Sequence, residues 1–252
     1  MIKLKHLFDY LDEIKNKKLI LLLDYDGTLT PIVSRPEYAV LSDDMRNVLK
    51  RIAKRYPLAI ISGRSLEDVR DMVNVDGIYY AGNHGFEITN DVKLVNPDAE
   101  KIKPVINEIC RKMQKRLIHI KGSIVENKGL TASVHYRMVS NDDFIELEKI
   151  FDEVAASYVK DRKIRITKGK KVFEIRPNIE WDKGKAVEFV IDAIGKKGTP
   201  VYIGDDRTDE DAFTILKDKG ITVLVSEKIK ETNAEYYLRN VDEVKSFLEG
   251  LL

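Results

Sequence analysis

The residues with the clearest capacity for chemistry are two aspartates, Asp24 and Asp26, in the segment DYDGT at 24–28. They follow the apolar run LILLL at 19–23, which is typical of a buried strand in a parallel sheet. Carboxylates held so close together raise each other's pKa unless a cation lies between them. Mg²⁺ prefers carboxylate and carbonyl oxygens and leaves positions for water and phosphate. The pair therefore predicts a magnesium site, although a turn that merely ends a strand is an alternative.

Three further residues are suited to binding a phosphate group. Thr28 follows Gly27, which allows a sharp turn, and offers both a hydroxyl and a backbone N–H. Ser62 ends the next predicted strand, in ISGRS at 61–65, and its hydroxyl can donate to a phosphate oxygen. Lys183 precedes a predicted helix and can neutralise both a phosphate and a nucleophilic carboxylate. Taken singly, Ser62 and Lys183 are residues of a kind that is more often found on an ordinary surface.

A second acidic cluster, GDDRTDEDAF at 204–213, also follows a short apolar run. Asp205 and Asp206 lie where the predicted strand ends, so both acidic clusters are expected at one edge of the sheet. The later acids also suit a helix N-terminus, with Thr208 and Asp211 as a capping box. Capping accounts for those later acids but not for the adjacent pair at the strand end.

The elements that must position these residues form two kinds of pattern. Apolar strand runs alternate with amphipathic helices at both ends of the chain, whereas the middle predicts a helix, two strands, a helix and two strands. We therefore predict an α/β fold with a Rossmann-like parallel-sheet core, formed by residues 1–87 and 178–252, and an inserted α+β cap domain at 88–177. The first 18 residues are expected to form a packed leading helix.

Composition excludes some classes of partner. Lys and Arg number 43 against 42 Asp and Glu, so no overall positive charge favours nucleic acid or an anionic membrane. The longest aliphatic run, at 19–23, is far shorter than the roughly 18–20 residues of a membrane span. The single cysteine, Cys110, cannot form an internal disulfide, which is consistent with a reducing compartment. We therefore expect a cytoplasmic protein that binds neither nucleic acid nor membrane.

The ordered set DYDGT, ISGR, a lysine before a helix and GDD resembles the haloacid dehalogenase superfamily of phosphotransferases. The resemblance implies a core of that type, Asp24 as a covalent nucleophile and Asp26 as the general acid/base. It further implies roles in phosphate and Mg²⁺ binding. The implied phosphate ligands are Ser62, Gly63, Thr28 and Lys183, and the implied metal ligands are Asp24, Asp26 through its backbone carbonyl, Asp205 and, in a supporting role, Asp206.

Within that superfamily, several segments resemble trehalose 6-phosphate phosphatases. They are GNHG at 82–85, VENKGLTASVHYR at 125–137, GKKVFEIRP at 169–177, WDKGKAV at 181–187 and GDDRTDEDAF at 204–213. The resemblance implies Mg²⁺-dependent hydrolysis of trehalose 6-phosphate through an aspartyl phosphate, with functional coupling to a trehalose 6-phosphate synthase. It also implies two groups of sugar-binding residues: Glu126, Lys128 and Glu174 in the cap, and Arg64, Asn83 and His84 on the core.

Other functions fit the same residues. A related phosphatase acting on sucrose 6-phosphate or mannosyl-3-phosphoglycerate has the same core motifs. A phosphomutase transfers the aspartyl phosphate to a sugar instead of water. A catalytically inactive module that binds a sugar phosphate is a third alternative, but such a module has no need of the nucleophile Asp24.

Overall fold

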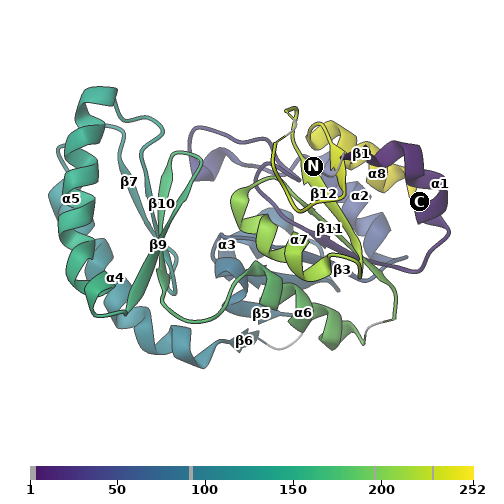
Figure 1. The fold of residues 1–252 in the computed structure, drawn as a ribbon, viewed down its shortest axis with the longest axis horizontal. Helices are drawn as coiled ribbons and strands as arrows, with labels where there is room; N and C mark the ends of the chain where they lie inside the picture. Colours follow the sequence, from purple (N-terminus) through teal and green to yellow (C-terminus); the bar gives the residue numbers. More distant parts are fainter. Residues whose placement is uncertain (1–3, 91–92, 196, 229) are drawn as a thin grey trace. The chain divides into compact units, whose positions relative to one another are not determined.

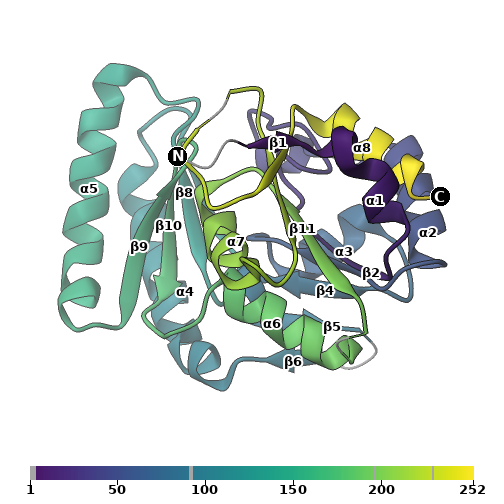
Figure 2. The same ribbon diagram turned by 45° about the vertical axis from the view of Figure 1, so that its right-hand side comes forward.

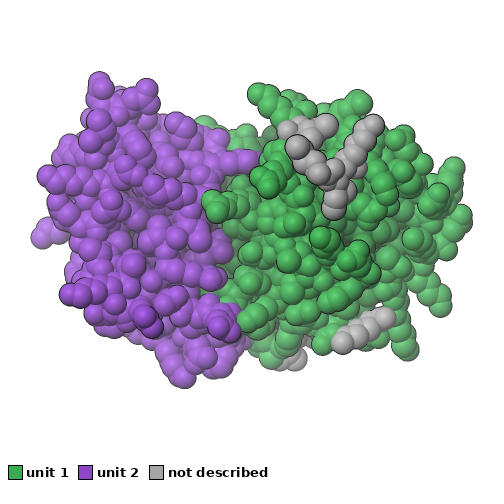
Figure 3. Space-filling view, in the orientation of Figure 1, with its two compact units in different colours: residues 1–94, 181–252 green, residues 95–180 purple. Residues whose placement is uncertain are grey.

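The computed structural model describes residues 4–90, 93–195, 197–228 and 230–252. The chain divides into two compact units, coloured separately in Figure 3: residues 1–94 with 181–252, and residues 95–180. The sequence placed the first boundary at 87/88. The structure places it at 94/95, because β5 (Glu87–Thr89) pairs with β4 in the sheet of unit 1 and the boundary falls within the next strand of that sheet, β6 (Lys93–Val95).

Unit 1 is built on a nine-stranded sheet, which confirms the predicted α/β class (Figures 1 and 2). Neighbouring strands are parallel from β1 through β4, and β5 is antiparallel to β4. In spatial order, the strands before β5 and β6 are β1 (Lys5–His6), β13 (Tyr236–Leu238), β12 (Ile221–Val225), β11 (Thr199–Gly204), β2 (Leu19–Leu23), β3 (Leu58–Ile61) and β4 (Tyr79–Gly82).

Helices cover both faces of this sheet, and alternate residues of β2 show how. Leu19, Leu21 and Leu23 pack on one face against α1 (Leu11–Lys15), α2 (Asp43–Ala53), α3 (Leu66–Val73) and α8 (Val241–Gly250). Ile20 and Leu22 pack on the other face against α6 (Lys183–Ile194) and α7 (Glu210–Leu216). Burying each such side chain contributes about 1.5–3 kcal/mol, so β2 is firmly fixed where its carboxyl end delivers Asp24.

Local signals explain where several helices begin. Ser42 and Ser65 each accept a hydrogen bond from the backbone N–H three residues later, so these serines are the N-caps of α2 and α3. The Asp68 carboxylate, three residues after Ser65, accepts a hydrogen bond from Arg64 Nη1 at 2.9 Å. The single leading helix was wrong: residues 5–15 form β1, a 3₁₀ turn and α1, and residues 1–3 lie outside the described part.

Unit 2 has the predicted α+β pattern. Its four antiparallel strands lie in the order β7 (Ile124–Asn127), β8 (Ala132–His135), β10 (Val172–Pro177), β9 (Ile164–Gly169). Helices α4 (Pro97–Leu117) and α5 (Asn141–Lys160) pack an apolar core against one face of this sheet. The first strand begins at Ile124, because residues 118–123 turn after α4. Glu126, Ser133 and Glu174 are register partners across neighbouring strands.

Of the helices in the described ranges, none has both the length and the apolar character needed to cross a membrane.

Candidate active site

The predicted site residues of unit 1 gather at the carboxyl ends of three adjacent parallel strands. Asp24 follows β2, Ser62 follows β3 and Asp205 follows β11, and β2 lies between the other two. The Asp24 backbone N–H donates to Ile203 O at 2.9 Å, which holds the end of β2 against β11. Ligands bind outside this edge of open α/β sheets because strand order and loop direction leave a crevice there.

Asp24 is one of two carboxylates that share the ammonium of Lys183. Lys183 Nζ lies 2.7 Å from Asp24 Oδ1 and 2.7 Å from Asp209 Oδ1, and all three side chains are buried. Burial alone would lower the pKa of Lys183, but the negative charges of Asp209 and Asp24 outweigh it and hold that pKa well above its usual value. Lys183 therefore stays cationic beside Asp24.

Asp209 bonds the predicted site residue Lys183, although the sequence did not indicate Asp209 as a site residue. Its Oδ1 accepts from Tyr202 OH at 2.8 Å as well as from Lys183, and its Oδ2 accepts from the backbone N–H groups of Asp205 and Asp206. The capping box expected from Thr208 and Asp211 is wrong, since Asp206 and Asp209 form it. In the sequence, the only indication of a role for Asp209 is its place three residues after the N-cap Asp206. Its bond to Lys183 depends on the fold.

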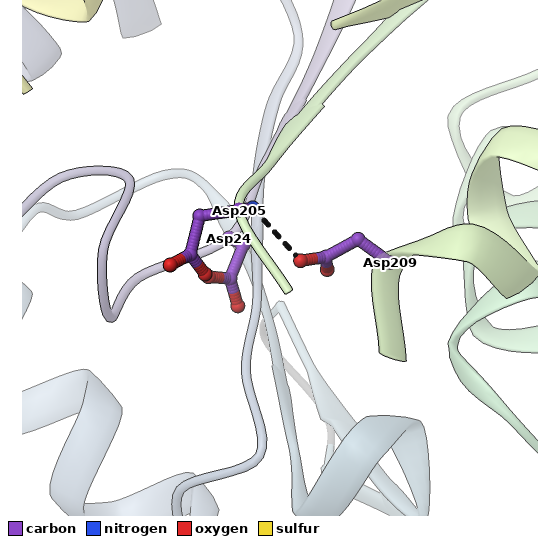
Figure 4. Close-up of side chains that lie close together, drawn as sticks. All are labelled: Asp24, Asp205 and Asp209. Carbon is purple, nitrogen blue, oxygen red and sulfur yellow. Dashed lines mark hydrogen bonds between the residues drawn. The ribbon is translucent and has the colours of Figure 1, made fainter. Parts of the chain in front are cut away.

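Asp24, Asp205 and Asp209 form a buried group of carboxylates (Figure 4). One oxygen from each lies within 4.8 Å of the others, whereas Lys183 supplies a single positive charge. Burial, together with the charges of Asp209 and Asp205, raises the pKa of Asp24 well above its usual value, although Lys183 acts in the opposite direction. A divalent cation would offset this repulsion, so the donor set fits a metal ion.

Two other predicted metal residues lie outside this carboxylate group. Among the described residues, the group comprises Asp24, Asp205 and Asp209, so the Asp206 and Asp26 side chains are not part of it. Asp206 is instead the N-cap of the turn at 207–209. Asp26 is predicted to bind the metal through its backbone carbonyl, so the position of its side chain does not test that prediction.

Gly27 is required by the close approach of Asp205 to the DYDGT loop. Gly27 has φ +85°, and a Cβ built there would lie 2.0 Å from Asp205 Oδ2. The Gly27 N–H donates to Thr30 O at 2.7 Å, which closes the loop tightly. The glycine predicted for a sharp turn therefore also makes room for the second acidic cluster.

Replacing Gly27 with Ala is expected to lower the free energy of unfolding by about 1–3 kcal/mol through its left-handed backbone alone, and further through displacement of Asp205. Urea unfolding measures this loss. The matched control is Gly77→Ala, where φ is +73° but no atom lies within 4 Å of the added Cβ. Equal losses in the two variants would contradict the close contact with Asp205.

Three of the predicted phosphate ligands, Thr28, Ser62 and Gly63, lie in the segments that follow β2 and β3. Thr28 is fully buried, and its hydroxyl donates to Asp24 Oδ2 at 3.4 Å. The Ser62 hydroxyl accepts from the Arg64 N–H at 3.1 Å, so its own proton is available for another acceptor. A Cβ at Gly63 would lie 2.6 Å from the His84 ring, so this glycine lets the imidazole pack against the loop.

Asn83 and His84 occupy strained positions next to this loop. Their φ values are +50° and +57°, in the left-handed region that non-glycine residues rarely adopt. The His84 N–H donates to Ser62 O and the Asn83 N–H to Arg64 O, so the strained turn is tied to ISGR. Asn83 Nδ2 also donates to Glu87 Oε2 at 2.7 Å. Their sugar-binding role stays a prediction.

In unit 2 the three predicted sugar-binding residues of the cap form one polar cluster. Lys128 Nζ lies 3.5 Å from Glu174 Oε1 and 3.9 Å from Glu126 Oε2. Ser133 Oγ donates to Glu174 Oε1, and His135 Nε2 lies 2.8 Å from Glu126 Oε2. The pKa of Glu126 is lowered because Lys128 and His135 outweigh the effect of burial. Charged donors and acceptors thus converge on one face of the cap sheet.

Comparison with known proteins identifies the family. A sequence model described as trehalose-phosphatase matches residues 22–242. "Probable trehalose-phosphate phosphatase E" of Arabidopsis thaliana is 44% identical over 261 residues, which cover 97% of this chain and 73% of the relative. "Trehalose 6-phosphate phosphatase RA3" of Zea mays is 40% identical, covering 94% of this chain and 70% of the relative.

Solved structures agree on the fold. The C-terminal domain of trehalose-6-phosphate phosphatase from C. albicans aligns with a TM-score of 0.83 at 23% identity, covering 100% of this chain and 98% of that one. A haloacid dehalogenase-like hydrolase from Bacteroides thetaiotaomicron aligns with a TM-score of 0.63 at 19% identity, covering 93% and 99%. The match over residues 22–242 and the 44% identical relative show that the chain belongs to the trehalose-phosphatase family.

Proposed function

We propose that this chain is a Mg²⁺-dependent phosphatase that hydrolyses trehalose 6-phosphate to trehalose and phosphate. The observation that carries the proposal is the buried Asp24–Lys183 pair at the carboxyl edge of the sheet, in a chain of this family. A carboxylate held in a fixed position by a buried ammonium is oriented for nucleophilic attack. The names of the relatives support the sugar phosphate as substrate.

The proposed reaction has two steps. In the first, Asp24 attacks phosphorus in line, the ester P–O bond breaks, and Asp26 protonates the departing sugar oxygen. In the second, water attacks the phosphorus of the aspartyl phosphate, Asp26 accepts the proton of that water, and Asp24 is released. Lys183, Thr28 and Ser62 bind the phosphoryl oxygens and orient them for both attacks.

The proposed metal ligands are the carboxylates of Asp24 and Asp205 and the backbone carbonyl of Asp26. Mg²⁺ would supply charge neutralisation at the phosphoryl oxygens. Asp209 orients this set without needing to ligate, because Lys183, Tyr202 and two backbone N–H groups already occupy its oxygens. Asp206 supports the set by capping the turn that follows Asp205.

For the sugar, we propose that Glu126, Lys128 and Glu174 hydrogen-bond its hydroxyls. A site built to pair buried polar groups rejects a substrate that leaves them unpaired. The substrate itself is the product of a sugar-transfer reaction, so functional coupling to a trehalose 6-phosphate synthase is part of this proposal.

Replacing Glu174 with Gln is expected to lower kcat/KM for trehalose 6-phosphate by about 10- to 150-fold, because a hydrogen bond to a charged group contributes about 1.5–3 kcal/mol. The same variant should hydrolyse p-nitrophenyl phosphate, which has no sugar, at the wild-type rate. Glu148→Gln is the matched control, since Glu148 lies in an exposed ion pair with Lys168 in the same unit. Equal losses on both substrates, or none on either, would contradict a role in sugar recognition.

The rival phosphatases are separated by one comparison of substrates. Steady-state kcat/KM is measured for trehalose 6-phosphate, sucrose 6-phosphate, mannosyl-3-phosphoglycerate and glucose 6-phosphate. The proposal expects trehalose 6-phosphate to be the best substrate. If it is no better than the simple hexose phosphate, the specific assignment is lost, while the phosphatase chemistry of Asp24 stands.

A further inference from the structure

We propose that Arg64 and Asp68 are positioning residues for Asp26, and that they fix the orientation in which Asp26 exchanges protons with the leaving group and with water. The inference rests on the proposed function, because it concerns the residue expected to act as general acid/base. It assigns Arg64 a role other than sugar binding, and it brings in Asp68, which the motifs do not include.

The contact between Arg64 and Asp26 uses both oxygens of the carboxylate. Arg64 Nε lies 2.7 Å from Asp26 Oδ2 and Nη2 lies 2.8 Å from Asp26 Oδ1. Two parallel charge-assisted bonds fix the plane of a carboxylate, which a single bond to a lysine would not do. The Arg64 side chain is only 6% exposed, so solvent competes weakly for these bonds.

Arg64 is in turn held from two other directions. Its Nη1 donates to Asp68 Oδ2 at 2.9 Å, and its Nη2 donates to Pro36 O at 2.8 Å. The guanidinium also lies over the Tyr25 ring, 5.3 Å from the centroid. The negative charges of Asp26 and Asp68 outweigh burial and raise the pKa of Arg64 further, so the guanidinium remains charged.

The two residues that hold Arg64, Asp68 and Pro36, belong to different kinds of element. Asp68 lies in the first turn of α3, whose N-cap Ser65 directly follows Arg64, whereas Pro36 begins a short 3₁₀ helix, Pro36–Tyr38. One partner therefore comes from an α-helix that packs in the core and the other from a single 3₁₀ turn. Four hydrogen bonds occupy four of the five guanidinium N–H groups, which leaves little capacity for sugar hydroxyls.

This arrangement has a direct consequence for proton transfer. A general acid must lie within about 2.6–3.2 Å of the atom that it protonates, so its orientation limits the rate. When Asp26 has given its proton to the sugar oxygen, the resulting carboxylate is stabilised by Arg64. Arg64 cannot replace Asp26 as the acid, because a guanidinium does not lose its proton in proteins. Its bonds to Asp68 and Pro36 keep it in place throughout the cycle.

The test is Asp68→Asn, which keeps the side-chain shape but removes the charge that holds Arg64. We expect kcat for trehalose 6-phosphate to fall about 10- to 100-fold, the cost of a misplaced catalytic group, with KM within about twofold of wild type. The first turnover of p-nitrophenyl phosphate, followed as p-nitrophenolate release by stopped flow, should keep its wild-type rate. That leaving group needs no proton.

Asp43→Asn is the matched control, because Asp43 is also in a first helical turn and pairs with an arginine, Arg46, at 2.9 Å. It should change neither rate. Asp68→Glu, which retains the charge, should recover part of the lost kcat and is informative even if Asp68→Asn proves unstable in thermal unfolding.

Unchanged kcat in Asp68→Asn, or an equal fall in the first turnover of p-nitrophenyl phosphate, would overturn the positioning role. Failure of the proposed function looks different, because the wild type itself would then not hydrolyse trehalose 6-phosphate.

Discussion

Replacing Asp24 with Asn is expected to reduce phosphate release by at least about 10⁴-fold, as loss of a covalent nucleophile does in other enzymes. Asparagine has nearly the same shape, but its amide is a poor nucleophile and carries no charge for Lys183. The measurement is phosphate release with saturating Mg²⁺ and trehalose 6-phosphate. The physical reason is local: Asp24 is 5% exposed, and its Oδ1 lies 2.7 Å from the Lys183 ammonium.

The same variant also tests the covalent step. Acid quenching of the wild type during turnover should yield a peptide containing Asp24 that is heavier by one phosphoryl group, and the Asn variant should yield none. Asp205→Asn serves as a comparison, because it weakens the metal site without removing the nucleophile. Substantial turnover by Asp24→Asn, or phosphorylation of another residue, would contradict the assignment.

Replacing Lys183 with Met is expected to affect both catalysis and folding. Removing the positive charge that orients the nucleophile and the phosphoryl group should lower kcat by about 10²- to 10³-fold. Removing one partner of a buried ion pair should also lower the free energy of unfolding by about 3–5 kcal/mol, since Asp24 and Asp209 would remain buried without their shared cation. Urea unfolding in EDTA isolates this effect from metal binding.

The pH dependence of this effect follows from the raised pKa of Lys183. Stability from a lysine with a raised folded-state pKa is fully present below its unfolded pKa of about 10.4 and is lost only as the pH rises through the folded value. The wild type and Lys183→Met should therefore still differ in their free energy of unfolding at neutral pH. Lys50→Met, on an exposed position of α2, should leave both kcat and stability close to wild type. If the free energy of unfolding of Lys183→Met equals that of the wild type, the stabilising role of the buried ion pair is contradicted.

The carboxyl edge of the sheet was predictable because its signals are local. The apolar run before Asp24 and the one before Asp205 each mark a buried strand, and acids at both strand ends must meet when the strands are parallel neighbours. The strands that the sequence did not reveal are short. β1 has two residues and β13 three, with partly exposed side chains, so neither shows a clear period.

The parts of the site that could not be predicted depend on long-range contacts between side chains. Asp209 follows Asp205 by four residues and resembles an acid at a helix N-terminus, yet its oxygens bond Lys183, which is 26 residues earlier. The sequence resemblance implies that Arg64 binds sugar, yet its guanidinium group bonds the carboxylate of Asp26, which is 38 residues earlier. Spacing along the chain carries no information about such pairs until the strands between them are placed.

The most direct test of the central claim is phosphate release from trehalose 6-phosphate by the wild-type protein, measured with Mg²⁺ and again after treatment with EDTA. The account predicts rapid release with Mg²⁺, loss of release in EDTA and recovery when Mg²⁺ is added back, since the carboxylates of Asp24 and Asp205 need a cation to bind a phosphate. No release with Mg²⁺ present, or the same rate in EDTA, would contradict it.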